Sequence, residues 1–160
     1  MATFFLMMDS PIGILKLTSD EFQLKSISFD GEVALDTPFI PEILLHVKKQ
    51  LQEYFDGIRQ HFDVPLGPDG STFQHQVWDQ LTNVPYGSTK SYIDIARALG
   101  SESSSRAVGM ANGRNPIPIL IPCHRIIGHN GKLTGYAGGL ERKKWLLIHE
   151  QQYVRKDHLF

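Results

Sequence analysis

The chain has 160 residues, of which 41% are hydrophobic and 21% charged, and its formal net charge is −1. This composition is typical of a globular protein and excludes a disordered chain. No apolar run is long enough to span a bilayer and the first residues do not resemble a secretory signal, so we expect no membrane partner. A single cysteine excludes an intramolecular disulfide and a cysteine-rich zinc site, which predicts no bound metal and a reducing compartment, the cytoplasm or, in a eukaryote, the nucleus.

The first half of the chain predicts a small sheet followed by a helix. Up to about residue 32, apolar residues come near to a period of two, and turns are expected at Ser10-Pro11, Ser19-Asp20 and Asp30-Gly31. Residues 41–57 place apolar side chains every three to four positions and end in Gly57, which predicts a helix. Residues 63–71 are rich in Pro, Gly and Asp and are the best linker candidate. We therefore predict an N-terminal α/β domain of residues 1–70 and a C-terminal domain of residues 71–160.

The second half predicts mainly helices. A helix follows Ser71 and Thr72, the segment "PYGS" forms a turn, and residues 89–100 form a further helix that ends in Gly100. Residues 101–115 then predict a short helix capped by serines. A helix, a turn with glycine and a short helix rich in small residues form a helix-turn-helix pattern. Many helical hairpins with this pattern do not bind DNA, so the pattern alone does not decide the function.

The charges are unevenly distributed along the chain. Residues 1–85 contain five Lys and Arg against twelve Asp and Glu, whereas residues 86–145 contain nine against three. A basic second half is typical of a surface that binds a polyanion. Ordinary solvated faces explain the same numbers equally well.

The short helix of residues 106–114 has an unusual composition. Ala107 and Gly109 stand where a helix that reads the major groove carries long polar side chains. Because each glycine costs a helix about 0.8–1.0 kcal/mol relative to alanine, something is expected to approach this backbone closely. A DNA minor groove flanked by Arg106 and Arg114 is one candidate, and close packing within the protein is the other.

The single cysteine lies in the rigid apolar segment "PIPILIPCHRIIG", residues 116–128, which predicts a buried strand or extended chain. A buried cysteine is most often just a small apolar residue. Here His124 and Arg125 follow Cys123, and both can favour the thiolate. A histidine that acts as a base needs an orienting carboxylate, and Glu150 on the expected last helix is a candidate.

The segment "NPIPILIPCHRIIGHNGKLTGYAGGLERKKWLLIHE", residues 115–150, resembles the signature region of the O6-alkylguanine-DNA alkyltransferases. The match extends over the second half from about Phe73 and includes "VPYGSTKSYIDIA" and the Arg-Ala-Val-Gly start of the short helix. The resemblance implies an α+β fold, with a small ribonuclease H-like domain of sheet and helix before a mainly helical domain with a helix-turn-helix. It also implies a monomeric DNA repair protein that needs no cofactor and binds double-stranded DNA through the minor groove. Such a protein would flip O6-alkylguanine out of the duplex and transfer the alkyl group irreversibly to itself.

The resemblance further implies roles for single residues. Cys123 would accept the alkyl group, His124 would take the thiol proton through a bound water, and Glu150 would orient His124. Asn115 would brace the turn that carries the site, and Tyr92 would donate a hydrogen bond to the flipped guanine.

Other residues would bind the DNA and the base. Arg106 would fill the space that the flipped nucleotide leaves, while Ala107 and Gly109 would lie in the minor groove near Arg114. The backbone of Cys123 and Ile126 would accept from the guanine amino group. The residues expected to line the substrate pocket are Tyr136, Ala137, Ile126 and Pro118.

Two residues depart from the family pattern. Ala137 replaces a hydroxyl residue, so a hydrogen bond to O6 at this position must come from the backbone N–H. Asn112 stands where we expect an apolar residue, and we expect neither residue to touch the transfer machinery. Relatives that do not transfer alkyl groups lack the cysteine, and Cys123 separates this chain from them.

Two other functions compete with alkyl transfer as explanations of these residues. A DNA-binding regulator with Cys123 as a sensor predicts a polar reading face on residues 106–114, and that face is mostly alanine and glycine. A cysteine hydrolase needs an oxyanion hole and an orienting Asn or Asp, and the surrounding sequence lacks the papain-type and caspase-type signatures. The sequence therefore favours the alkyltransferase.

Overall fold

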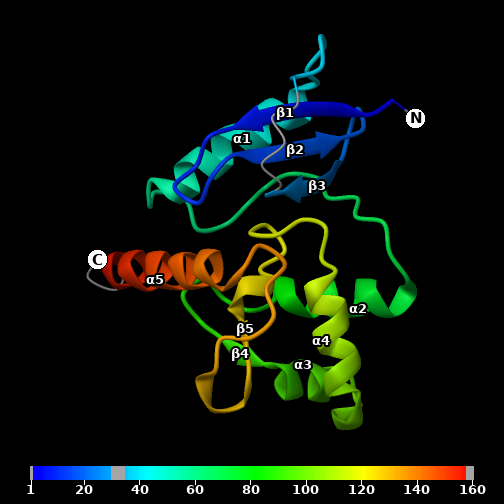
Figure 1. Cartoon of the computed structure of the whole chain (residues 1–160), viewed down its shortest axis with the longest axis vertical. Coiled ribbons are helices and arrows are strands. Elements are labelled where there is room, and N and C mark those ends of the chain that lie inside the picture. The colour runs from blue at the N-terminus through cyan, green and yellow to red at the C-terminus, as the bar shows by residue number, and fades with distance from the viewer. Residues whose placement is uncertain (1, 30–34, 158–160) are drawn as a thin grey trace. The chain divides into compact units, whose positions relative to one another are not determined.

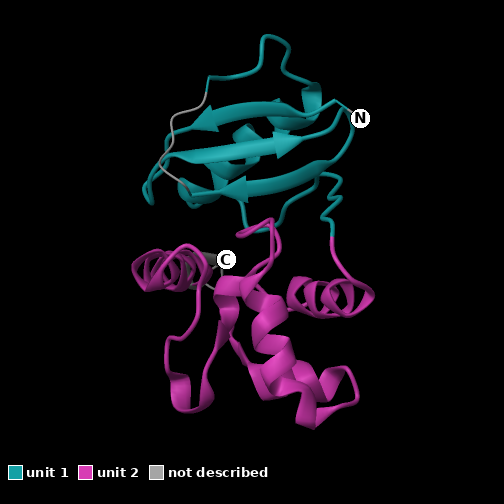
Figure 2. Ribbon diagram, turned by 45° about the vertical axis from the view of Figure 1, so that its right-hand side comes forward, with its two compact units in different colours: residues 1–69 teal, residues 70–160 magenta. Residues whose placement is uncertain are grey.

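The computed structural model describes residues 2–29 and 35–157, and the chain divides into two units, residues 1–69 and residues 70–160 (Figure 2). The turn predicted at Asp30-Gly31 lies outside the described residues. None of the helices in the described part of the chain is long and apolar enough to cross a membrane.

The first unit is an antiparallel sheet covered on one face by a helix (Figure 1). Its strands lie in the order β1 (Phe4–Met8), β2 (Leu15–Ser19) and β3 (Leu24–Ser28), and the helix is α1 (Glu42–Phe55). Alternate residues of β2 are buried, as the period of two predicts. The core of the unit includes Leu15, Leu17, Leu24, Leu44, Val47, Leu51 and Tyr54.

Part of the predicted linker pairs with the sheet. The N–H of Leu24 donates to the Pro65 carbonyl, and the N–H of Gly67 donates to the Leu24 carbonyl, at 2.9 Å in both cases. Lys25 also forms an ion pair of 3.1 Å with Asp69. Residues 65–67 are therefore held at the free edge of β3, which their composition did not indicate.

The second unit consists mainly of helices. They are α2 (Thr72–Thr82), α3 (Tyr92–Ala98), α4 (Ser105–Gly113) and α5 (Leu140–Asp157). Ser71 and Gln74 form a reciprocal capping box at the start of α2, where the sequence predicts a cap. α3 and α4 pack against each other as the helix-turn-helix. The predicted α+β class is confirmed, with a small sheet and helix before a helical unit.

The predicted helix of residues 89–100 is shorter than expected. Lys90 and Ser91 form the strand β4, which pairs in parallel with β5 (Ile126–Ile127). Ser91 then caps α3, because its hydroxyl accepts from the Asp94 N–H while the Asp94 carboxylate accepts from the Ser91 N–H. This short pairing connects the start of the helix-turn-helix to the segment that follows Cys123.

The serine cap predicted for α4 is wrong in its details. A 3₁₀ turn, η1 (Glu102–Ser104), precedes the helix, and the side chain of Ser104 makes no capping hydrogen bond. The Ser104 hydroxyl lies 2.8 Å from the hydroxyl of Ser101 instead. Serines within one turn can bond to each other as well as to the backbone, and composition does not decide between the two.

The buried strand or extended chain predicted for residues 116–128 is also wrong, except at its end. Residues 117–121 form a turn, Cys123–Arg125 form the 3₁₀ turn η2, and only Ile126–Ile127 is a strand, before the 3₁₀ turn η3 (His129–Gly131). The N–H of Ile121 donates to the Ile117 carbonyl at 3.0 Å, which closes the turn around Ile119. Ile119 has φ of 76°, a conformation that a β-branched residue rarely adopts.

Candidate active site

Cys123 lies at the start of η2, with His124 beside it and Glu150 supplied by α5. All three residues are buried, with 4%, 0% and 1% of their surface exposed. His124 Nε2 lies 2.6 Å from Glu150 Oε2. The other oxygen of this carboxylate accepts from the Arg125 guanidinium at 2.8 Å and from the Gly87 N–H at 3.2 Å. The parts of the site therefore come from the loop before α3, from η2 and from the last helix.

The electrostatics of this group decide which nitrogen of His124 carries the proton. Burial alone would raise the pKa of Glu150, but His124 and Arg125 outweigh it and hold that pKa well below its ordinary value. Burial lowers the pKa of His124, although Glu150 acts in the opposite direction. A neutral imidazole facing an ionised carboxylate carries its hydrogen on Nε2. Nδ1 is then a free base, and it is buried with no hydrogen-bond partner among residues 2–29 and 35–157.

The Cys123 thiol is protonated at neutral pH in this environment. Burial raises the pKa of the thiol to about 11, while a hydrogen bond from Asn115 and the charge of Lys143 act to lower it. The thiolate is the nucleophilic form of cysteine. The site therefore needs a base to remove the proton. His124, the next residue in the chain, is the candidate, because its Nδ1 carries no hydrogen-bond partner among the described residues.

Asn115 holds the turn that carries the cysteine. Its side-chain amide donates to the Ile121 carbonyl at 2.7 Å, and its side-chain oxygen accepts from the Ile117 N–H at 3.0 Å. These bonds clamp both sides of the strained residue Ile119. Backbone strain persists only where the surroundings fix it and is common at functional sites. Asn115, which directly precedes residues 116–122, therefore fixes the conformation of this segment.

Lys143 is a residue of the site that the sequence analysis missed. Its side chain is buried, and its ammonium donates to the Ile126 carbonyl at 2.5 Å and to the Thr134 carbonyl at 2.7 Å. Burial lowers the pKa of Lys143 to about 8. The spacing was a usable signal, because Lys143, Leu146 and Glu150 recur at helical intervals on the buried face of α5.

Arg125 completes the buried charge group. Its guanidinium also donates to the Val84 carbonyl at 2.8 Å, in addition to the bonds with Glu150. In the structure the Arg125 side chain is directed at the Glu150 carboxylate rather than at the Cys123 thiol. A buried carboxylate lowers stability unless a hydrogen-bonded partner of opposite charge accompanies it, and Arg125 is that partner for Glu150.

The predicted pocket residues lie in different environments. Tyr92 is half-buried at the start of α3, and its hydroxyl donates to the Thr134 carbonyl at 3.3 Å. Ile126 and Pro118 are buried in the segment around Cys123. Tyr136 is buried, and burial raises the pKa of its hydroxyl well above the ordinary value, whereas Ala137 is exposed.

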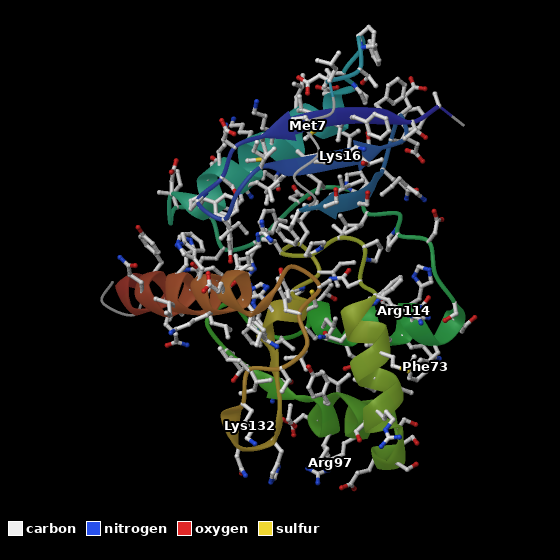
Figure 3. All side chains as sticks on the ribbon, in the orientation of Figure 1. Met7, Lys16, Phe73, Arg97, Arg114 and Lys132 are labelled. Carbon is white, nitrogen blue, oxygen red and sulfur yellow. The ribbon has the colours of Figure 1, made fainter. Side chains whose placement is uncertain are left out.

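Three of the four predicted DNA-binding residues are exposed on α4 or directly after it, and the fourth, Gly109, is half-buried. Arg106, Ala107 and Arg114 are exposed, and Figure 3 shows Arg114 at the end of this helix. A cavity of about 530 Å³ lies beside the same helix. The residues that line it are Ser91, Tyr92, Ile93, Ser105, Arg106, Gly109, Met110 and His129.

The glycines of α4 are not required by packing inside the unit. A methyl group added to Gly109 would lie 3.7 Å from the Tyr92 ring, an ordinary contact, and one added to Gly113 would meet nothing within 4 Å. Close packing within this unit, one of the two explanations offered for these glycines, is therefore wrong. The close approach of a DNA minor groove to this helix stays a prediction.

Asn112 does touch the machinery, contrary to expectation. It is 2% exposed on the inner side of α4, and its side-chain amide donates to the Cys123 carbonyl at 3.4 Å. Nearby, the Trp78 indole donates to the Ala111 carbonyl at 2.9 Å and anchors this end of the helix to α2. The expectation failed because the helical phase of residue 112 turns it inward, towards η2.

Fold and site together define a class: a two-unit α+β protein with a buried cysteine and a His–Glu pair beside a helix-turn-helix. Among the described residues, no three His, Cys, Asp or Glu side chains are grouped so that they could hold a metal ion.

Comparison with known proteins agrees with this class. The family model "6-O-methylguanine DNA methyltransferase, ribonuclease-like domain" matches residues 4–68, and "6-O-methylguanine DNA methyltransferase, DNA binding domain" matches residues 72–152. The methylated-DNA–protein-cysteine methyltransferase of Methanosarcina acetivorans is 46% identical over 149 residues, which cover 90% of this chain and 96% of that protein. The constitutive enzyme of that name from Bacillus subtilis is 40% identical, with 93% and 95% covered.

Solved structures show the same relationship. The crystal structure of Mycobacterium tuberculosis O6-methylguanine methyltransferase has a TM-score of 0.86 and 41% identity, and the match covers 95% of this chain and 94% of that one. Mycobacterium tuberculosis OGT in complex with DNA has a TM-score of 0.84 and 42% identity, with 93% of each chain covered. The chain therefore belongs to the 6-O-methylguanine DNA methyltransferase family, and it is a transferase enzyme with a DNA-binding domain.

Proposed function

We propose that this protein repairs DNA by flipping O6-alkylguanine out of the duplex and transferring its alkyl group once, irreversibly, to Cys123. The observation that carries the proposal is the buried Cys123 next to His124 in the chain. His124 Nε2 lies 2.6 Å from Glu150, and its Nδ1 has no partner in the part of the chain that the structure describes. A base with one nitrogen anchored and the other free can take the thiol proton. Membership of the family supplies the substrate class that the geometry alone does not name.

The atoms of the transfer balance without a cofactor. The thiol proton passes to His124 Nδ1, by way of a water, and the sulfur attacks the alkyl carbon in line with the bond to O6. The carbon–O6 bond breaks with its electron pair on the oxygen, and the base takes up one proton, for which Tyr92 is the donor. His124 then releases its proton to solvent and Tyr92 regains one from solvent, so the net transfer is of the thiol proton to the base. The products are guanine and a thioether on Cys123. A thioether has no easy route back to the thiol, so each molecule acts once.

The reacting carbon lies inside the duplex, so the nucleotide has to leave the stack. The exposed face of α4 suits a minor groove, because Ala107 and Gly109 allow a close approach and Arg106 is free to enter the space left behind. Arg114 at the other end of the helix is available to phosphates. We assign DNA binding and transfer to residues 71–160, residues 1–70 to the ribonuclease-like domain, and action to the monomer.

The mass of the intact protein tests this function. After incubation with an excess of duplex that contains one O6-methylguanine, we expect a single stoichiometric gain of one methylene, located on Cys123 by peptide digestion. The undamaged duplex is the control and leaves the mass unchanged. Bound DNA with no gain in mass would point to the regulator, and repeated turnover with an unmodified cysteine would point to a hydrolase.

Replacing Arg106 by alanine separates flipping from chemistry. We expect transfer from duplex DNA to slow by about tenfold or more, because unstacking costs a few kcal/mol and nothing fills the gap. The reaction with a free O6-alkylguanine base, measured as the rate of alkylation of Cys123, stays within about twofold of wild type because no stack is opened.

Arg97→Ala is the matched control for charge. Arg97 is exposed on α3 and bonded to Glu102 at 2.9 Å, so its loss removes one positive charge from the same unit. We expect it to change both reactions little. Equal slowing of duplex and free-base reactions in Arg106→Ala would argue against a role in flipping.

A further inference from the structure

The exposed side of α4 carries one large apolar side chain. Among the large apolar residues of α3 and α4, all of them in the described part of the chain, Met110 alone is exposed, at 56%. The other residues exposed on α4 are charged or small, namely Arg106, Ala107 and Gly113. Single apolar residues are common on protein surfaces, so exposure alone does not make Met110 functional. A role for it has to follow from its surroundings.

Met110 lies in a row with two arginines. Arg106, Met110 and Arg114 follow one another at intervals of four residues, so they share one side of the helix, and all three are exposed. Two cations that can bind phosphates therefore stand at the ends of the row, with an apolar side chain between them. This order of charges is complementary to a DNA minor groove, where base edges lie between two phosphate backbones.

Met110 also borders the cavity beside α4. It lines this cavity of about 530 Å³ together with Arg106 and Tyr92. In the proposed function, Arg106 enters the gap that the flipped nucleotide leaves, and Tyr92 contacts the flipped base. A side chain that lines the same cavity stands next to the base pairs that flank the gap.

The width of the minor groove explains why an apolar side chain is useful at this place. The minor groove of B-DNA is about 6 Å wide, whereas an α-helix with its side chains is about 10–12 Å across. The small residues Ala107, Gly109 and Gly113 make α4 thinner, but the groove still has to open for a helix to enter. Apolar side chains that wedge between base pairs open the groove in other minor-groove proteins, and methionine is one of the residues used.

The spacing of the row agrees with the spacing of base pairs. Four residues advance a helix by about 6 Å, and base pairs are stacked about 3.4 Å apart. With Arg106 in the gap and α4 along the groove, Met110 therefore lies within two base pairs of the gap. The flexible thioether side chain of methionine adapts to an irregular apolar surface, such as a partly opened base step.

We propose that Met110 is a second groove-opening residue: its side chain enters the minor groove and wedges against a base pair beside the gap that Arg106 fills. The wedge lowers the cost of unstacking before transfer and takes no part in the chemistry at Cys123. The inference rests on the proposed function, because it assumes that a nucleotide is flipped out of a duplex for transfer.

The test compares O6-methylguanine in a duplex with the same lesion in a single-stranded oligonucleotide, where no groove has to open. The rate of Cys123 methylation is measured for both, and the ratio of the duplex rate to the single-strand rate is compared between proteins. For Met110→Gln, which keeps the length of the side chain and removes its apolar character, we expect this ratio to fall by about three- to tenfold. For Met110→Leu, which stays apolar, we expect a ratio within about twofold of wild type.

A matched control comes from α5. Ile148 is also 56% exposed, so Ile148→Gln makes the same kind of change on another helix of the same unit and is expected to leave the ratio at the wild-type value. Met110 is exposed, and glutamine and leucine are both good helix formers. Neither Met110 variant is therefore expected to change the temperature of thermal unfolding.

A second measurement reports on the wedge directly. 2-Aminopurine, a base whose fluorescence rises when it is unstacked, is placed two base pairs from the lesion, on the 5′ side in one duplex and on the 3′ side in another. On mixing with wild type we expect a rise in emission before transfer in at least one of these duplexes. With Met110→Gln we expect this rise to be smaller by at least about twofold.

The outcomes are distinct. A ratio that falls in Met110→Gln but not in Met110→Leu or Ile148→Gln, with the smaller rise in emission, supports the wedge. An unchanged ratio in Met110→Gln, an equal fall of both rates, or a fall in Met110→Leu of the same size overturns the inference and leaves the proposed function standing. If wild type is methylated by neither oligonucleotide, the proposed function itself fails, and the inference fails with it.

Discussion

We expect replacement of Cys123 by alanine to abolish alkyl transfer and to leave DNA binding at the wild-type level. The effect is complete because Cys123 is the only cysteine of the chain, and no other thiol can take its place. The change is small in volume, and the DNA-binding surface that we assign to α4 is exposed elsewhere in the unit. The measurement combines intact mass after incubation with O6-methylguanine duplex and a titration of labelled duplex.

The control for this prediction is wild-type protein whose thiol has been alkylated beforehand by a small reagent. It also cannot transfer, so any removal of methyl groups by it or by Cys123→Ala would show a different acceptor and contradict the mechanism. A loss of DNA binding in Cys123→Ala would show instead that the thiol supports the fold of the DNA-binding surface.

Replacing Glu150 by glutamine is expected to lower the free energy of unfolding by about 3–5 kcal/mol. The carboxylate accepts from Arg125, His124 and the Gly87 N–H, and its loss leaves the Arg125 charge buried without a counter-charge. Denaturation by urea at pH 7 measures the change. Glu141→Gln, at the exposed start of the same helix, is the matched control and should cost less than about 1 kcal/mol.

The direction of the Glu150 pKa shift determines how the stability difference between wild type and Glu150→Gln changes with pH. The pKa of Glu150 in the fold lies below its ordinary value of 4.5, so its stabilisation is present above pH 4.5 and is lost as the pH falls through the folded pKa. The stability difference between wild type and Glu150→Gln should therefore shrink in acid. A difference that stays constant from pH 7 to strong acid would contradict the ionised Glu150.

Transfer by Glu150→Gln is expected to slow by about 100-fold or more at pH 7. The glutamine amide can donate to Nε2 as well as accept from it, so the His124 hydrogen is no longer fixed on Nε2. The pKa of His124 also falls further because its negative neighbour is gone. The rate is measured at a temperature where the variant is fully folded. Unchanged transfer by the folded variant would remove Glu150 from the relay.

The periodicity of apolar residues was sufficient to predict the first sheet and most of the helices, but not β4 or the start of α3. α1 and α2 lie where their spacing indicates, because each buries one face against its own unit. The strand predicted around Cys123 was wrong because prolines and isoleucines also suit a buried irregular turn. Whether such a segment extends or turns depends on partners such as Asn115, which local propensity does not contain.

For the site, sequence and structure contributed different kinds of information. The sequence by itself determined the α+β class, the family and the association of Cys123 with His124, because these depend on residue types in a fixed order. Only the tertiary structure decided that Lys143 and Asn112 bond to the backbone around Cys123, and that Asn112 keeps an unpartnered oxygen there. The physical reason is that these contacts join residues on different elements, and a hydrogen bond depends on distances and directions that exist only after those elements have packed.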